Sequence, residues 1–271
     1  MSEIYEIAAS TMRQDMGRIE RVGMNMANLF TPGYKREVVL GAPLNAGRVG
    51  LVSADTAGAG EAGGALGAAA TGDFAALIDG ARAPGQAQQR TVTDVRPGTL
   101  RITGQPLDLA LAGPGYFEVA TDAGPAYTRA GNFRLDGGGR IVTAAGLPLQ
   151  GQAGEIRLAG LDLRSVRIDA AGRVFEGERM VDQLKVLRFD RPALLQRLGN
   201  TLLGAADAAG MPRPVADADV QLRQGMLENA NVDNAQEMIE LTRATRHFES
   251  LQRGLQIYDE LLGTALRRIA E

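Results

Sequence analysis

The sequence predicts an α+β protein in which an antiparallel β domain is inserted between N- and C-terminal helices that pair into a coiled-coil-like helical domain. Three observations support this fold class. Apolar residues recur at helical spacing at both ends of the 271-residue chain, a period of two occupies its middle, and an Ala/Gly-rich stretch separates the first helix from the strands. The expected parts are an N-terminal helix in 1–36, a connector in 37–90, a β domain in 91–217 and a C-terminal helix in 218–271.

The first helix is expected to end at about Leu29 or Phe30, because Pro32 lacks a backbone N–H and Gly33 permits a turn. Its apolar seam, interrupted by Asp15, has a heptad-like spacing and consists of Tyr5, Met12, Ile19 and Met26. Further apolar side chains lie off this seam, and they are Ile7, Met16 and Met24. The helix is therefore expected to contact more than one neighbour.

Residues 41–90 differ from the rest of the chain, because 26 of these 50 residues are Gly or Ala and they show almost no periodicity. This composition is typical of a flexible or weakly structured connector. Within it, only the stretch from Phe74 to Ile78 is a candidate for a short helical turn or strand.

The middle of the chain, from Thr91 to about Phe189, alternates apolar and polar positions, as in "LDLAL" at 107–111, with turn residues at short intervals. This pattern predicts short strands joined by hairpins. Two segments share one turn pattern, "LDGGGRIV" at 135–142 and "IDAAGRVF" at 168–175. In each, we expect the Asp to cap its own turn and the Gly three places later to adopt a positive φ. Two hairpins with the same turn chemistry are favoured over a duplication.

The C-terminal region, from about Ala218, is expected to return to helix and carries the strongest periodic signal. Its a and d positions are apolar over four heptads, and the a positions are Leu241, Phe248, Leu255, Leu262 and Ile269. A helix of about forty residues spans about 60 Å, whereas a β domain of about 120 residues is about 35 Å across. The β domain alone therefore cannot cover this seam, and the N-terminal helix is the expected partner.

Two helices still leave apolar side chains uncovered, and ordering so long a tail costs more conformational entropy than burial of the a positions returns. We therefore expect both termini to be mobile in the monomer and to become ordered when many copies pack together.

The composition excludes several classes of function. The chain has no cysteine, a single histidine, His247, and a formal net charge of -3. These features provide no thiolate metal site, no catalytic triad and no electrostatic footprint for nucleic acid. The first thirty residues lack the apolar run of a signal peptide or membrane span. We expect no catalytic, cofactor-binding or metal-binding residues, no nucleic acid and no membrane insertion.

Four segments, taken in order, resemble motifs of the bacterial flagellar rod and hook family of axial proteins. "ANLFTPGYK" at 27–35 resembles the motif that closes the family's N-terminal helix. "TGQPLDLALAGPGYF" at 103–117 and "YTRAGNFRLDGGGRIVT" at 127–143 resemble two motifs of its β domain, and "NVDNAQEMI" at 231–239 is similar to the start of its C-terminal helix. The chain departs from the family in its Ala/Gly-rich insert and in Met24, where the family has Asn.

The resemblance implies a structural subunit of the basal-body rod, with the proximal rod favoured over the distal rod. Such a subunit would leave the cell unfolded through the flagellar type III export apparatus and polymerise into a tube with copies of itself and with other rod and hook proteins. Its terminal helices would form the inner layer and its β domain the outer wall of a periplasmic rod that transmits torque. A hinge motif would fix the bend between helix and outer domain, and its residues are Asn28, Thr31, Pro32, Gly33 and Tyr34.

Several alternatives remain beside this interpretation. Asn28 and Tyr34 could instead be ordinary surface residues of a loop. The alternative function is a surface-exposed binding or adhesive β-module, which would not need paired seams at the two ends. A glycan hydrolase with paired carboxylates is less favoured, because each candidate already has a turn or strand explanation; the candidates are Asp108, Asp122, Asp136 and Asp169.

Overall fold

The computed structural model describes residues 2–40, 90–160, 163–199 and 201–270, without the side chains at 2–4, 40, 90, 257–259 and 261–270. The chain divides into two compact units, residues 1–38 with 92–271 and residues 39–91. The second unit contains the ends of β1 (Glu37–Leu40) and β2 (Arg90–Thr93), which form a two-stranded sheet. The predicted connector, including the short element considered at 74–78, otherwise lies outside the described residues.

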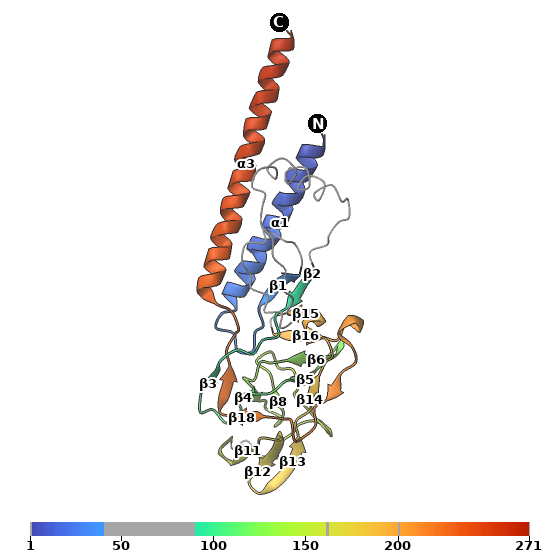
Figure 1. Ribbon diagram of the computed structural model, residues 1–271. Helices are drawn as coiled ribbons and strands as arrows, with labels where there is room; N and C mark the ends of the chain where they lie inside the picture. The colour runs from blue at the N-terminus through green and yellow to red at the C-terminus, as the bar shows by residue number, and fades with distance from the viewer. Residues whose placement is uncertain (1, 41–89, 161–162, 200, 271) are drawn as a thin grey trace, which may run out of the picture. The chain divides into compact units, whose positions relative to one another are not determined.

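Two long helices occupy the ends of the chain, α1 (Ser2–Ala27) and α3 (Asn234–Ala270). They lie side by side in the first unit (Figure 1). The two helices run antiparallel. Asp15 near the middle of α1 contacts His247, whereas Asn25 near the end of α1 contacts Glu237 in the first turn of α3. α1 ends slightly before the predicted position, since the Leu29 N–H bonds to the Met26 carbonyl in a tighter, i to i−3 turn.

The prediction of helix for residues 218–233 was wrong, because this stretch contains two short strands. They are β18 (Leu222–Gln224) and β19 (Met226–Glu228), joined by Gly225 at a φ of 73°. β18 pairs with β4 (Leu109–Leu111) and β19 with β3 (Leu100–Ile102). Burial of Leu222 and Leu227 in these ladders outweighs the helical tendency of the local sequence.

The remaining described strands and the short 3-10 helices lie between β4 and β18 in the sequence. The strands are β5 (Tyr116–Thr121), β6 (Gly124–Thr128), β7 (Arg134–Leu135), β8 (Ile141–Val142), β9 (Gln150–Gly151), β10 (Gly154–Glu155), β11 (Val166–Ile168), β12 (Arg173–Glu176), β13 (Arg179–Gln183), β14 (Val186–Arg188), β15 (Gln196–Gly199), β16 (Leu202–Gly204) and β17 (Arg213–Pro214). The 3-10 helices are η1 (Leu163–Ser165), η2 (Pro192–Leu194) and η3 (Asp207–Ala209).

The largest sheet has six strands in the order β15-β16-β6-β5-β14-β17, and β11-β12-β13 form a three-stranded sheet. The strand pairs from β3 to β19 are antiparallel, as the hairpin pattern predicted. The central hairpin joins β5 to β6, with Phe117 opposite Thr128 and Thr121 opposite Gly124. The α+β class is therefore confirmed.

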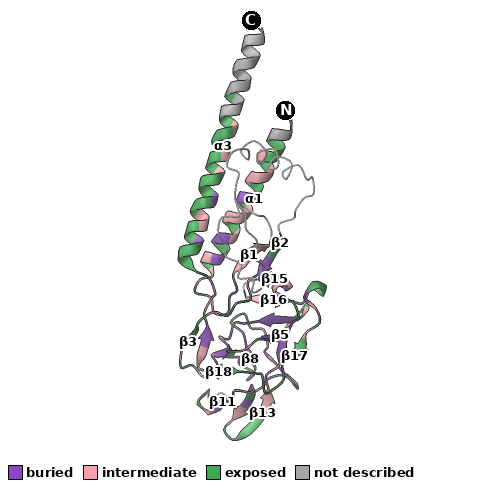
Figure 2. Cartoon of the chain, viewed as in Figure 1, coloured by how far each residue is buried: buried purple, intermediate pink, exposed green. Residues whose placement is uncertain are grey.

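The apolar core lies among these strands, whereas much of the surface of the helices is exposed (Figure 2). One cluster extends from Leu107 to Leu222 in sequence and includes Leu109, Phe117 and Val119, which have no exposed surface. A second cluster gathers Tyr116, Tyr127 and Phe189 with their neighbours. The strands thus enclose a core without help from the helices.

The two predicted turns have the same chemistry. In the first, Asp136 Oδ1 accepts hydrogen bonds from the N–H groups of Gly138 and Arg140 at 2.9 and 2.8 Å, and Gly139 has a φ of 74°. In the second, Asp169 Oδ1 accepts from the N–H groups of Ala171 and Arg173 at 3.0 and 2.9 Å, and Gly172 has a φ of 82°. Both the Asp cap and the positive φ are confirmed.

Candidate functional site

The first part of the candidate site is the contact between α1 and α3. On α1, Met12, Ile19 and Met26 are half-buried, while Tyr5 is 39% exposed. On α3, the predicted seam residues Leu241, Phe248 and Leu255 are half-buried. Leu262 and Ile269 belong to α3, but their side chains lie outside the described residues. Val22 and Ala244 are the buried apolar residues between the described parts of the two helices.

Polar pairs also cross this contact. Asp15, which interrupts the seam of α1, is 6% exposed and lies 2.6 Å from His247 Nδ1. Arg18 forms an ion pair with Glu240. The interruption is therefore matched by the only histidine of the chain, a pairing that spans 232 positions in the sequence.

The predicted hinge motif forms a turn directly after α1. The Asn28 side chain donates to the Met24 carbonyl at 2.9 Å and accepts from Thr31 Oγ1 at 3.1 Å. Pro32 is half-buried in the turn. Gly33 has a φ of 69°, and a Cβ at this position would clash with the backbone of Arg129 and Ala130. The Gly33 N–H donates to the Glu228 carbonyl at 2.7 Å, so the motif contacts the β strands directly.

Tyr34 is 1% exposed, so the alternative that it is an ordinary surface residue was wrong. Its hydroxyl donates to Asn25 Oδ1 at 3.1 Å, and the Arg197 guanidinium lies over its ring at 4.6 Å. Asn25 Oδ1 also accepts from the Glu37 N–H at 2.9 Å. One buried amide of α1 thereby holds both sides of the turn.

A buried ionic group, the Glu228 cluster, consists of Glu228, Lys35 and Arg129. The Glu228 carboxylate accepts from Lys35 Nζ at 2.5 Å, from Arg129 Nη1 at 3.3 Å and from the Gly98 N–H at 2.9 Å. Their side chains are 1%, 3% and 9% exposed. One anion thus serves two cations, and β19 is tied to the segment that follows α1.

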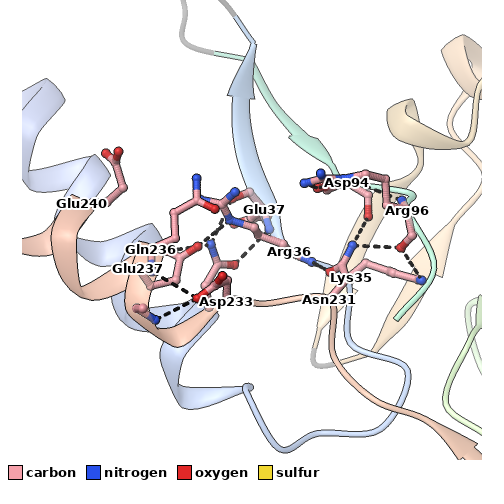
Figure 3. Close-up of polar contacts among 12 residues, drawn as sticks. Lys35, Arg36, Glu37, Asp94, Arg96, Asn231, Asp233, Gln236, Glu237 and Glu240 are labelled. Carbon is pink, nitrogen blue, oxygen red and sulfur yellow. Dashed lines mark hydrogen bonds and ion pairs between the residues drawn. The ribbon is translucent and has the colours of Figure 1, made fainter. Parts of the chain in front are cut away.

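The start of α3 is held beside this cluster by a second polar group (Figure 3). Asn231 Oδ1 accepts from the Arg36 N–H at 2.6 Å, while its amide donates to the carbonyls of Asp94 and Arg96. Asp233 caps α3 by accepting from the N–H groups of Ala235 and Gln236.

Glu237, which has no exposed surface, extends this second group from the first turn of α3. It pairs with Arg36 and accepts from the Asn25 amide at 3.4 Å. The beginning of α3, the end of α1 and the strand segments are therefore connected by buried polar contacts.

Burial shifts the titration of the groups in this junction. Desolvation lowers the pKa of the Lys35 amine, an effect that Glu228 opposes. Desolvation also raises the pKa of the Tyr34 hydroxyl, against the influence of Arg197. Both pKa shifts are in the direction expected for groups that are removed from water.

Sequence reasoning found the hinge motif but missed the ionic group behind it. Lys35 and Arg129 both lie within quoted motifs, "GYK" and "YTRAG", yet their common partner Glu228 lies outside any motif. One signal for this group is present in the sequence, since Glu228 is a charged residue directly after the apolar Leu227. If residues 226–228 are assigned to a strand, Leu227 and Glu228 point to opposite faces, and a Glu228 side chain inside the protein needs a buried cation as its partner.

The described residues hold no group of three or more His, Asp or Glu side chains placed to bind a metal ion. None of the helices, as far as they are described, combines the length and apolar character needed to cross a membrane.

Two family models match the chain. Residues 110–176 match the flagellar hook protein FlgE/F/G D1 domain, and residues 223–268 match the C-terminal part of the flagellar basal body rod FlgEFG proteins. The first match lies in the strands and the second covers β18, β19 and most of α3. Together they include much of the candidate site but not α1.

Curated relatives extend the likeness to the remaining parts. The flagellar basal-body rod protein FlgG of Bacillus subtilis is 30% identical over 93% of this chain and 94% of its own length. FlgG of Caulobacter vibrioides is 27% identical over 94% and 95%, and FlgF of the same organism is 32% identical over 64% and 70%. Because the match to the Bacillus subtilis protein reaches 30% identity over nearly the whole of both chains, this chain belongs to the family of flagellar basal-body rod proteins.

Proposed function

We propose that the protein is a structural subunit of the bacterial flagellar basal-body rod, which self-assembles through its terminal helices into a tubular axial structure that transmits torque. The observation that carries this proposal is the set of apolar side chains that the α1 and α3 pair leaves about half exposed: Tyr5, Ile7, Met16, Met24, Met238 and Ile239. Several large apolar side chains left exposed on one pair of helices favour burial against another protein.

These exposed side chains do not lie on a single line along α1. Ile7 and Met16 are separated by nine positions, which places them on opposite sides of a helix with 3.6 residues per turn. A single added helix would leave one of them in water. Packing among several copies, with the two helices as a coiled-coil-like core domain, covers both.

The junction connects the helices firmly to the strands, as a subunit that transmits torque requires. The Glu228 cluster and the Asn25, Arg36 and Glu237 contacts hold the helices to the strands through buried, charge-assisted hydrogen bonds. In this proposal, residues 1–36 and the C-terminal helix form the core domain, the strands form an outer domain inserted between them, and the hinge motif fixes the bend. Force applied to the outer domain would then be transmitted to the helices through a rigid junction.

The proposed location is the periplasmic rod of the basal body, with copies of the chain and other rod and hook proteins as partners and the flagellar export apparatus as its route. The role is mechanical, so no enzymatic activity is assigned. A rod rather than a hook position is supported by the relatives that match nearly the whole chain, which are named as basal-body rod proteins. Within the rod, we propose the proximal position.

The test compares two double variants of the full chain. Ile7→Ser with Met16→Ser alters the helix surface, and Leu198→Ser with Met211→Ser removes two exposed apolar side chains from the β part. Sedimentation velocity and negative-stain electron microscopy are recorded as the protein is concentrated. We expect polymers from the unmodified chain and from the β-part variant, and monomers from the helix variant.

Two results would overturn the proposal. One is an unmodified chain that stays monomeric and resists limited proteolysis along its full length, because its helices would then be satisfied within one molecule. The other is polymerisation that is lost equally in both variants. In the first case, a self-contained binding module would be the remaining interpretation. In the second case, the contacts of the polymer would not be specific to the helices.

A further inference from the structure

A cavity of about 350 Å³ opens in the strand region, away from the contact between the helices. Its walls come from β5, β14, η2 and the segments around residues 95–97 and 112–115. Most of its surface is apolar, with prolines and aromatic rings that include Pro97, Tyr116 and Phe189. A site of this size accommodates two or three amino-acid side chains.

The charged groups that line this cavity are of one sign. Arg129 and Arg188 are the charged residues in its lining, and no carboxylate is among the described lining residues. Arg129 shares its nearest anion, Glu228, with Lys35, which leaves an excess positive charge inside the protein. Arg188 is exposed and forms no ion pair with a carboxylate in the part of the chain that the structure describes.

An unused hydrogen-bonding group lies in the same lining. Tyr116 is 4% exposed, and its hydroxyl makes no hydrogen bond to any described residue. The Arg129 guanidinium lies 5.3 Å from the centre of its ring, and Arg129 Nε is buried without an acceptor among the described residues. Buried donors such as Arg129 Nε are uncommon without an acceptor in native proteins, and both this atom and the Tyr116 hydroxyl could donate to an acceptor brought by a ligand.

We propose that this cavity binds an acidic peptide segment of a partner protein, in which a carboxylate lies beside an apolar or prolyl residue. The carboxylate would pair with Arg188 and accept from the Tyr116 hydroxyl, while the apolar side chain would fill the space between Pro97 and Phe189. Arginine is well suited to such pairing because its planar guanidinium binds a carboxylate through two parallel hydrogen bonds. A neutral peptide would leave the excess charge of the site uncompensated.

The inference does not rest on the proposed rod function, because the site lies within the strands and its test uses the unassembled chain. The probe is the fluorescein-labelled peptide Ala-Pro-Leu-Glu-Pro-Ala amide, and its control is the same peptide with Gln in place of Glu. Fluorescence anisotropy is measured against the purified full chain carrying Ile7→Ser and Met16→Ser, which is expected to stay monomeric as it is concentrated. We expect a Kd below about 1 mM for the Glu peptide and binding at least about tenfold weaker for the Gln peptide.

Protein variants then place the binding in the cavity. Arg188→Gln removes a lining cation and should weaken binding by about tenfold, whereas Arg179→Gln makes the same charge change on exposed β13 and should leave it unchanged. Tyr116→Phe removes only the hydroxyl and should weaken binding by about threefold. The folding of each variant is verified by circular dichroism.

Three outcomes would overturn this proposal: no binding of the Glu peptide, equal binding of the Gln peptide, or equal losses from Arg188→Gln and Arg179→Gln. Equal binding of the two peptides would identify an apolar surface without charge recognition. Equal losses in the two arginine variants would identify long-range attraction to a basic surface. Neither outcome would bear on polymerisation through the helices.

Discussion

The strands and the helix pair of this protein bury their side chains in different ways. Among the strands, a contiguous apolar core includes Leu109 and Phe117, neither of which has any exposed surface. In the described parts of α1 and α3, only two apolar residues are buried, Val22 and Ala244, beside three polar ones, Asp15, Asn25 and Glu237. The strand region therefore contains its own source of stability, whereas the helix pair relies on polar contacts and leaves apolar side chains exposed.

This difference indicates that the two regions are built for different tasks. A closed apolar core stabilises one molecule by itself, because the apolar area is removed from water whatever its surroundings. A helix pair with an incomplete core gains the rest of its stability from further helices, so its order depends on protein concentration. A subunit that must stay unpolymerised until it reaches its place benefits from both properties.

The comparison is tested most strongly by two phenylalanine substitutions. Phe117→Ala opens a cavity in the strand core and should lower the free energy of unfolding of the monomer by about 3–5 kcal/mol. Phe248→Ala affects a half-buried position of α3 and should lower it by less than about 1 kcal/mol, while reducing polymerisation. Urea unfolding followed by tyrosine fluorescence measures the first quantity, and sedimentation measures the second.

The two regions would prove alike if Phe248→Ala destabilised the monomer as much as Phe117→Ala. Amide exchange in the unmodified monomer provides an independent measurement. Slow exchange should be confined to the strands, with fast exchange in both helices.

The junction between the regions should respond strongly to the loss of one charge. Glu228→Gln leaves Lys35 and Arg129 buried without their anion and should lower the free energy of unfolding by about 3 kcal/mol. Glu155→Gln is the matched control, because Glu155 pairs with Arg157 near the surface and should contribute less than about 1 kcal/mol. Equal effects of the two variants in urea unfolding would mean that the Glu228 cluster stabilises the junction no more than a surface ion pair does.

The hinge turn offers a matched pair of glycines. Gly33 and Gly104 have φ values of 69° and 73°, so alanine carries the same backbone strain at both. Only at Gly33 would the new Cβ clash, with the backbone of Arg129 and Ala130, while nothing lies within 4 Å at Gly104. Gly33→Ala should therefore cost about 1–3 kcal/mol more than Gly104→Ala in thermal unfolding. Equal costs would mean that the contact between turn and strands is dispensable.

Features of this fold that depend on neighbouring residues could be predicted from the sequence, whereas those that depend on contacts between distant segments could not. The two Asp-capped turns and the presence of a helix at each end depend on residues within a few positions of one another, so their local patterns were sufficient to predict them. The sequence does not predict β18 and β19, because each has three residues, too few to display a period, and their partners β4 and β3 lie more than a hundred positions earlier.

The same limit applies to the candidate site. Gly33 and Tyr34 belong to a recognisable motif, but the partners that explain them, Glu228 and Arg197, do not. In the sequence Asp15 only interrupts the seam, because its partner, His247, lies on the other helix. Such pairs are set by packing between distant segments, which no local spacing encodes.

Acid should weaken the strand region through its two turns. Hydrogen bonds from the Arg140 N–H and guanidinium lower the pKa of Asp136 below 3.8; burial would raise the pKa of Asp169, but hydrogen bonds from Arg173 and Ala171 outweigh it and lower that value too. Because the folded-state pKa values are depressed, their stabilisation is complete above 3.8 and is lost as pH falls through the lowered values.

Urea unfolding at about pH 6 and about pH 3 measures this effect. The unmodified chain should lose more stability on acidification than the double variant Asp136→Asn with Asp169→Asn. The double variant Asp122→Asn with Asp207→Asn provides the control, since both residues are exposed and neither side chain accepts a described hydrogen bond. The assignment fails if the turn variant and the control lose stability equally.

The smallest effect is expected where the helices meet through Asp15 and His247. The His247 side chain is 49% exposed, so water competes with the 2.6 Å contact, and a double-mutant cycle with Asp15→Asn and His247→Gln should give a coupling energy below about 1 kcal/mol in the monomer. A coupling above about 2 kcal/mol would mean that the pair is already held rigidly in one molecule. The helices would then be as self-sufficient as the strands, and their exposed apolar side chains would no longer require further copies for order. A small coupling that grows on polymerisation would instead show that neighbouring subunits remove water from this contact, which is the behaviour that an incomplete helical core predicts.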